Sequence, residues 1–121
     1  MILREIASLI RAEVLTGEEL LDTLDIECAY GADLMSDVLA FARPGSLLLT
    51  GLTNIQIVRT AQMLDLPSVV FVRGKKPQEP ALKLATQIKM PLMLCQMSMF
   101  ESCGILFQKG ILPCHIPNRG V

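Results

Sequence analysis

The sequence predicts a three-layer α/β/α domain with a mainly parallel sheet of about five strands. Three uncharged apolar runs begin at Leu47, Ser68-Val69 and Pro91-Leu92, and each ends in a polar corner followed by a helical pattern. Leu47, Val69 and Leu92 are 22 and 23 residues apart, which fits a strand, a three-turn helix and two loops. Runs that are apolar on both faces are typical of strands covered on both sides, the setting of parallel sheets.

The first third of the chain predicts elements that flank these units. Apolar residues recur at helical spacing over 2–10, which predicts an amphipathic helix covering the sheet. Residues 12–15 read as a short strand. Thr16 and Glu19 then have the spacing of a capping box, which predicts a brief helix.

A second strand and helix precede the central run. Residues 26–30 read as a half-covered strand, and Asp33 is a natural N-cap for a helix over 34–42. That helix should pack through an apolar face that includes Leu34 and Val38. The turn at 43–45 (RPG) ends it, because a residue before proline avoids the α region.

Composition limits the classes of function. A chain of 121 residues forms one domain, expected over 1–112, followed by a loose tail over 113–121. A net charge of −1 with 4% aromatic residues and no Trp does not suit nucleic acid. Hydrophobic residues make up 51%, a surplus that predicts a subunit interface in a homodimer.

No apolar stretch approaches the roughly 20 residues of a membrane helix, and the start lacks the pattern of a signal peptide. We therefore expect a cytoplasmic protein that does not associate with membranes. Its four cysteines form no CxxC pair, and in a reducing compartment they are expected to be small buried hydrophobes.

The sulfur-rich stretch 90–103 admits two interpretations. Its Met and Cys side chains are soft ligands that suit Cu(I) or a redox role. Strand alternation, however, sends neighbouring side chains to opposite faces, and Met commonly fills gaps in cores. We favour packing, and expect no metal and no cofactor.

Three tandem β-loop-α units bring the carboxyl ends of their strands to one rim of the sheet, where ligands bind in open α/β folds. Helix starts at such a rim offer free N–H groups and a partial positive charge. The polar residues predicted there suit a small anion, phosphate or carboxylate. They are Thr50, Gly51, Thr53 and Asn54, then Arg73, Gly74, Lys75 and Lys76, and finally Gln96 and Ser98.

A plainer interpretation of these residues stays open. In this interpretation Thr53 and Ser98 only cap helices, because each has a capping-box partner, Gln56 and Glu101 respectively. The lysines can be simply solvated. No spacing among these residues is diagnostic of one ligand.

Several segments resemble small bacterial proteins of the DRTGG-domain family. They are 31–40 (GADLMSDVLA), 49–54 (LTGLTN), 70–77 (VFVRGKKP), 91–94 (PLML), 98–101 (SMFE) and 103–104 (CG). The resemblance covers almost the whole chain except the tail. Residues 22–23 read Asp-Thr where relatives often have Asp-Arg.

The resemblance implies an α/β/α domain akin to the N-terminal domain of HPr kinase/phosphorylase and a middle domain of some phosphotransacetylases. There it serves as a regulatory or assembly module beside a catalytic domain, and it also occurs next to CBS domains, which bind adenine nucleotides. Stand-alone relatives recur in anaerobic bacteria, in gene neighbourhoods with iron-hydrogenase and signalling components.

Catalysis finds little support in the residues. A kinase P-loop needs G-x-x-x-x-G-K-[ST], and residues 49–54 contain one glycine and no lysine. His115 and Cys114 could form a catalytic pair only within the tail. Asp33 and Asp37 read as an N-cap and a first-turn acid rather than as paired catalytic acids.

The sequence therefore predicts a non-catalytic regulatory module that binds a small anionic metabolite or nucleotide at the rim and modulates an unknown protein partner. The main alternative is an interaction or assembly scaffold with an empty rim. A small phosphotransferase is the third interpretation.

Overall fold

The computed structural model describes residues 1–114. Its six strands form one sheet in the order β1-β5-β4-β3-β2-β6. Only β1 runs antiparallel to its neighbour β5, so the predicted mainly parallel sheet is confirmed. The strands are β1 (Glu13–Thr16), β2 (Cys28–Gly31), β3 (Leu47–Thr50), β4 (Val69–Phe71), β5 (Leu92–Leu94) and β6 (Leu112–Pro113).

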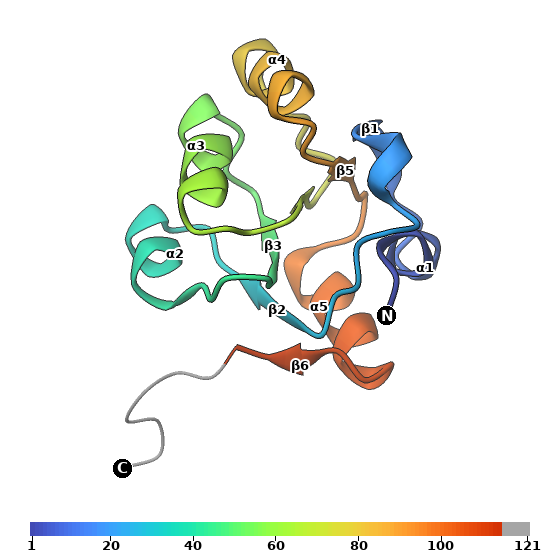
Figure 1. Ribbon diagram of the computed structural model, residues 1–121. Coiled ribbons are helices and arrows are strands. Elements are labelled where there is room, and N and C mark those ends of the chain that lie inside the picture. The colour runs from blue at the N-terminus through green and yellow to red at the C-terminus, as the bar shows by residue number, and fades with distance from the viewer. Residues whose placement is uncertain (115–121) are drawn as a thin grey trace.

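Helices cover both faces of this sheet, which confirms the three-layer architecture (Figure 1). α2 (Met35–Phe41), α3 (Ile55–Met63) and α4 (Glu79–Ile88) lie on one face. α1 (Leu3–Leu9) and α5 (Met99–Gln108) lie on the other, and a short 3-10 helix, η1 (Glu18–Leu20), follows β1.

The topology explains this division of the helices. From β2 to β5 each strand lies beside the previous one in the same direction, and right-handed connections then place α2, α3 and α4 on one face. After β5 the chain returns across the opposite face through α5 and ends in β6, beside β2. The loops after β4 and β5 thus leave toward opposite faces.

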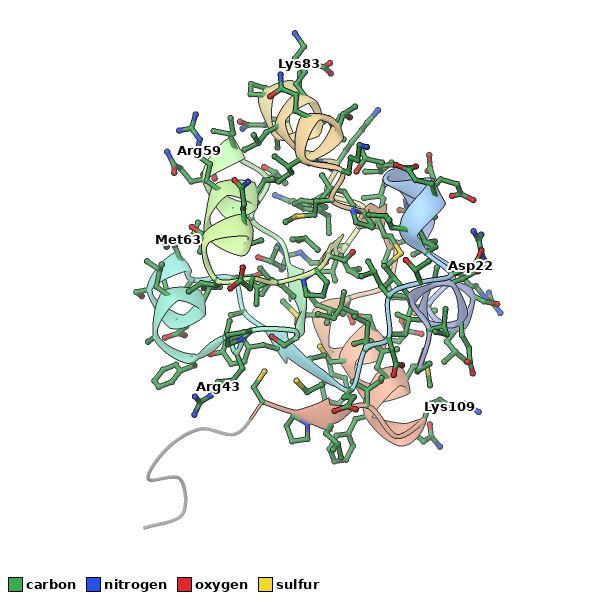
Figure 2. All side chains as sticks on the ribbon, in the orientation of Figure 1. Asp22, Arg43, Arg59, Met63, Lys83 and Lys109 are labelled. Carbon is green, nitrogen blue, oxygen red and sulfur yellow. The ribbon has the colours of Figure 1, made fainter. Side chains whose placement is uncertain are left out.

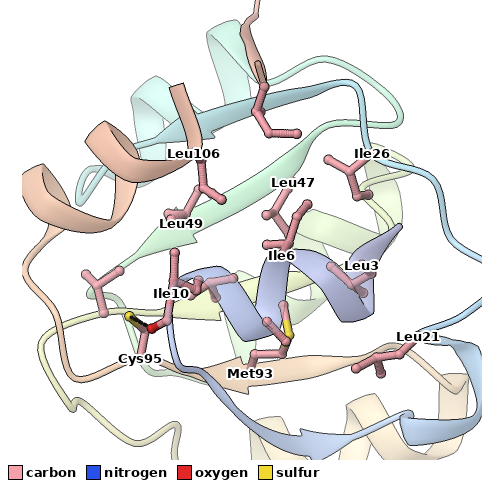
Figure 3. Close-up of a cluster of buried hydrophobic side chains, with 14 residues drawn as sticks. Leu3, Ile6, Ile10, Leu21, Ile26, Leu47, Leu49, Met93, Cys95 and Leu106 are labelled. Carbon is pink, nitrogen blue, oxygen red and sulfur yellow. Dashed lines mark hydrogen bonds between the residues drawn. The ribbon is translucent and has the colours of Figure 1, made fainter. Parts of the chain in front are cut away.

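Two hydrophobic cores follow from strand alternation. Leu47 and Leu49 of β3 pack in the first core with Ile6 of α1 and with Ile10, which directly follows that helix (Figure 3). Leu48, between them, belongs to the second core under α2, α3 and α4. Every side chain of β3 is buried, as the doubly apolar run predicts.

The sulfur-rich stretch supplies core residues. Met93 and Cys95 are fully buried in the first core, and Met90 belongs to the second. The Cys95 thiol donates a hydrogen bond to the Ile10 carbonyl at 3.2 Å (Figure 3). The packing interpretation is confirmed for these three residues.

Charged side chains lie at the periphery, as Figure 2 shows for Arg59, Lys83 and Lys109. Within 1–114, no helix has both the length and the apolar character that spanning a membrane requires. At the C-terminal side, Pro113 belongs to β6 and Cys114 is buried, although both were assigned to the tail. The remainder of that tail, 115–121 with His115, lies outside the described residues.

The predicted Thr16–Glu19 capping box is wrong, because Thr16 has partners in the sheet instead. η1 begins after Gly17 without a side-chain cap. The Thr16 hydroxyl donates to the Met90 carbonyl at 2.7 Å and accepts from the Leu92 N–H at 3.0 Å. The register of β1 against β5 shifts at this point, so the hydroxyl stands in for a backbone group that the irregularity displaces.

Candidate functional site

The rim at the carboxyl ends of the parallel strands gathers a cluster from three of them. Asp33 follows β2, Gly51 follows β3 and Arg73 follows β4. The Gly51 N–H donates to Asp33 Oδ1 at 2.6 Å, and Arg73 Nη1 donates to Asp33 Oδ2 at 3.1 Å. We call these three residues the Asp33 cluster.

Asp33 has a different role from the predicted one. Leu34, not Asp33, is the N-cap of α2, and no side chain caps that helix. The carboxylate instead reaches across to the loops after β3 and β4, where an N–H and a guanidinium are both available. The local sequence pattern indicates a helix cap, but it cannot reveal partners that lie 18 and 40 residues further along the chain. Leu34, expected to pack, is 59% exposed.

The Asp33 cluster is open to solvent. The side chains of Asp33 and Arg73 are each 45% exposed. An ion pair at such a position contributes at most about 1 kcal/mol, because water screens the charges and both side chains lose rotamer freedom. The two donors therefore hold a carboxylate that a competing anion can displace at small cost.

Gly51 lets Asp33 and Arg73 approach the strand end closely. A Cβ added at this position would collide with the Arg73 guanidinium and lie 3.1 Å from Asp33 Oδ1. The absence of a side chain thus lets the Arg73 guanidinium and the Asp33 carboxylate lie against the end of β3. Thr50, which is fully buried, shapes the same corner by accepting from the Leu52 N–H at 3.1 Å.

The corner after β4 is fixed by its backbone. Arg73 and Gly74 both have left-handed backbones, with φ of 59° and 66°. The Arg73 N–H donates to the Met97 carbonyl at 2.8 Å, and the Gly74 N–H donates to the Cys95 carbonyl at 2.9 Å. These hydrogen bonds join the loops after β4 and β5 where the two loops diverge toward opposite faces. Such a topological switch point is where open α/β sheets commonly bind ligands. The Gln96 side chain lies over Gly74.

The helix starts differ from one another in their capping. α3 begins after Asn54, which is exposed and makes no side-chain cap, so the predicted Thr53–Gln56 capping box is wrong. The Thr53 carbonyl accepts from the Gln78 N–H at 2.9 Å, which joins the starts of α3 and α4. Ser98 does cap α5, accepting from the Glu101 N–H at 3.1 Å.

The structure therefore divides the predicted site residues into two groups. Gly51 and Arg73 meet at Asp33, and the loops that carry Thr53, Asn54, Lys75 and Lys76 lead to the face of α3 and α4. Lys75 and Lys76 are exposed. Gln96 and Ser98 lead instead to α5, on the opposite face.

Sequence reasoning missed two charged residues at this rim. Asp33 was assigned to a helix cap, and Arg11 was assigned to the outer side of the first helix. Arg11 lines a hollow of about 350 Å³ together with Ile10, Gln96, Met97 and Glu101. Among the ion pairs of residues 1–114, none includes Arg11. No local signal could have placed it beside Gln96, because the two residues meet only through the sheet.

Groups that could carry metal or thiolate chemistry are not assembled in the described part of the chain. No three His, Cys, Asp or Glu side chains of residues 1–114 converge as a metal site would require. Burial raises the pKa of the Cys28, Cys95 and Cys103 thiols, and the neighbouring Cys114 adds to the effect at Cys28. Thiols with a raised pKa are poor nucleophiles at neutral pH.

Comparison with known proteins identifies a shared fold. No protein-family model matches the sequence, and no curated protein matches it. The structure is similar to the crystal structure of the CBS and DRTGG domains of the regulatory region of Clostridium perfringens pyrophosphatase, complexed with the activator diadenosine tetraphosphate. The TM-score is 0.69 at 16% identity, over 96% of this chain and 51% of that one, so the chain spans about half of its neighbour's length. The likeness is one of fold, and it agrees with the DRTGG-like architecture that the sequence resemblance implies.

Proposed function

We propose that this protein is a non-catalytic, cytoplasmic regulatory module that binds a small anionic ligand at the rim of its sheet. The observation that carries the proposal is the Asp33 cluster, in which a backbone N–H and a guanidinium already hold a carboxylate. Donors arranged for an internal carboxylate are also arranged for a phosphate, which brings more charge and more acceptor oxygens.

In this proposal the ligand replaces Asp33. Its anionic group accepts from the Gly51 N–H and Arg73, with Thr50 shaping the floor of the site. Asn54, Lys75 and Lys76 contact the rest of the ligand from the loops toward α3 and α4, while Thr53 and Gly74 keep those loops in place. Ser98 offers the start of α5 to a ligand long enough to extend to the opposite face.

Release of Asp33 would carry the signal. Residues 32–34 connect β2 to α2, so a freed carboxylate loosens the entry of that helix. Leu34 and Leu39 are 59% and 47% exposed in this part of the chain, and they offer an apolar contact to a protein partner. Ligand binding at the rim would thereby bias partner binding at α2.

The ligand class that we favour is a nucleotide or another phosphorylated metabolite. The structural neighbour is a regulatory region complexed with a dinucleotide polyphosphate, which supports a regulatory role for this fold with such ligands. Two subunits offer two rims, and we propose that the module works as a homodimer.

Thermal-shift titration tests the proposal. The purified protein is titrated with adenine mononucleotides, diadenosine tetraphosphate, acyl phosphates and nicotinamide dinucleotides. The double variant Arg73→Ala/Lys75→Ala should lose ligand-induced stabilisation while its melting stays cooperative. Arg59→Ala, which removes an exposed charge from α3, is the matched control and should behave as wild type (Figure 2).

Asp33→Asn gives the sharper result. It removes the competing negative charge with little change of shape, so the affinity for the anion should rise about fivefold, the equivalent of about 1 kcal/mol. Weaker binding in Asp33→Asn would show that Asp33 contacts the ligand rather than competing with it, and would contradict the displacement mechanism.

The alternative function is an assembly scaffold without a ligand. The Asp33 cluster also favours this alternative, because Asp33 already accepts from the Gly51 N–H and from Arg73, and no ligand is then needed to satisfy these donors. Stabilisation of neither wild type nor Asp33→Asn by any of these ligands would support the scaffold. Release of labelled phosphate from ATP by the pure protein would support the phosphotransferase instead.

A further inference from the structure

The outer face of α5 carries an apolar stripe that the fold leaves uncovered. Phe100 is 90% exposed and Phe107 is 68% exposed, although the chain has only four phenylalanines. With Gly104 between them they are four and then three residues apart, so they lie on one side of the helix. Exposing two large apolar side chains side by side is unfavourable unless something covers them.

No neighbouring atom of the subunit requires glycine at position 104. It lies inside α5, where glycine is less favourable than alanine, and a Cβ added there would meet no atom within 4 Å. Gly31 differs, because a Cβ on it would lie 2.9 Å from both Cys103 Sγ and Met99 Sδ. Packing within the subunit therefore does not require glycine at 104, and its absence of a side chain leaves the α5 backbone open to close approach from outside.

A groove of about 650 Å³ runs beside this stripe, between α5 and the edge of the sheet. The β2 residues that face α5, Ala29 and Gly31, have little or no side chain, and this leaves space for the groove. Its lining is almost wholly apolar and includes Phe100, Phe107 and Cys103 from α5 and Leu112 and Cys114 from the β6 side. Leu112 is itself 61% exposed.

We propose that this face is a self-association surface, on which α5 packs antiparallel against α5 of a second copy with Gly104 at the crossing. Consecutive residues of a helix are rotated by about 100°, so Phe100 and Phe107 flank Gly104 on the side of the groove. Glu101 and Gln108 flank it on the other side. A twofold axis through the crossing then sets Phe100 of one copy against Phe107 of the other, twice.

The polar positions agree with the same arrangement. The twofold axis sets Glu101 against Gln108 of the second copy, a carboxylate against an amide that can donate to it, and no two like charges meet. The phenyl rings of each copy meet at the mouth of the other's groove, where the small residues of β2 leave room. The surface is therefore complementary to itself, as a twofold interface requires.

The exposed phenyl rings supply part of the area that each partner of an ordinary dimer buries. The two phenyl rings expose roughly 300 Å², against the roughly 800 Å² that each partner buries in a standard interface. Leu112, the groove and the flanking polar residues supply additional area. This inference rests on the homodimer of the proposed function and names its surface. The anion site is built from other loops, so loss of the dimer and loss of ligand binding are separate outcomes.

Sedimentation of the full chain over a range of concentrations tests the proposal. We expect a monomer–dimer equilibrium that Gly104→Glu and Phe100→Ser each weaken about tenfold or more in Kd. Gly104→Ala should raise the melting temperature of the monomer through its helix propensity while weakening the dimer, and this combination also shows that the variant is folded. Met63→Ser, which changes a side chain that is 65% exposed on α3, is the matched control and should leave the dimer unchanged.

Three outcomes would overturn the proposal. One is a monomer at every concentration, and another is a dimer whose Kd does not change in the Gly104 and Phe100 variants. The third concerns residues 115–121, which directly follow the groove-lining Cys114. If only a chain ending at Cys114 dimerises, the groove belongs to the chain's own last residues rather than to a second copy.

Discussion

Gly17 and Gly51 each lack a side chain for a different physical reason. A Cβ on Gly17 would lie 2.6 Å from the Pro91 Cα, and the backbone there is left-handed with φ of +70°. A Cβ on Gly51 would collide with the Arg73 guanidinium, the mobile end of a long side chain. The neighbour can yield in the second case and cannot in the first.

The two glycines should therefore respond differently to alanine. Gly17→Ala should lower the free energy of unfolding by about 2 kcal/mol or more, through backbone strain and collision. Gly51→Ala should lower it by less than about 1 kcal/mol, because it breaks only an exposed ion pair. Urea denaturation of both variants measures the difference, and equal losses would mean that the Arg73 side chain is held rigidly.

The buried Cys95 thiol should make stability depend on alkaline pH. Burial raises its pKa above the ordinary value of 9.0, so the folded protein holds the thiol proton more tightly than the unfolded chain does. The stability that the protonated Cys95 thiol contributes is then fully present below about pH 9, and it is lost as the pH rises through the pKa of the thiol in the folded protein. The stability difference between wild type and Cys95→Ser should be constant at neutral pH and should shrink above about pH 9. A difference that does not change with pH would show that Cys95 is not shielded from water.

At the scale of elements, β1 depends on one hydroxyl. Thr16 is at the register shift of β1 and bonds both the Met90 carbonyl and the Leu92 N–H. Thr16→Val keeps the shape and leaves both groups without their partner, so it should cost about 1–3 kcal/mol in unfolding free energy. Thr23→Val is the control, because Thr23 is exposed and bonds only the carbonyl of Leu20 in its own turn. A similar loss of unfolding free energy in Thr23→Val would mean that replacing any threonine by valine has this effect, whatever hydrogen bonds the hydroxyl makes.

Local sequence pattern identified elements better than it identified their partners. The apolar run at 47–50 predicted β3 because both faces of the strand are apolar, and this pattern can be recognised without knowing which strands lie beside it. β6 was missed because Leu112–Pro113 is too short to have a period, and pairing with β2 alone defines it. Asp33 was assigned to a cap for the same reason, since its partners Gly51 and Arg73 are far along the chain.

At the scale of the whole molecule, protection should fall from the centre of the sheet to its edges. β3 and β4 have paired strands on both sides and helices on both faces, whereas β1 and β6 each pair with a single strand. Amide hydrogen exchange should therefore be slowest in β3 and β4 and faster at β1 and β6. Equal protection of β6 and β3 would show that the outer edge of the sheet is covered in solution.

The fold class followed from the sequence because it rests on many residues that agree, whereas the candidate site rests on few. The three strand-to-helix corners were expected to form one cradle, and their donors are divided between two faces by the return of the chain through α5. Only the strand order reveals that division, and the strand order depends on contacts that no single segment encodes.

The return of the chain through α5 also sets the order of events during synthesis. Among the strands of residues 1–114, β2 is the second to be synthesised, yet its outer neighbour β6 is the last of them. Until then the nascent chain carries an unpaired strand edge, a common starting point for aggregation. Synthesis of β6, or protection of that edge by a chaperone until β6 is made, should therefore limit aggregation of the nascent chain.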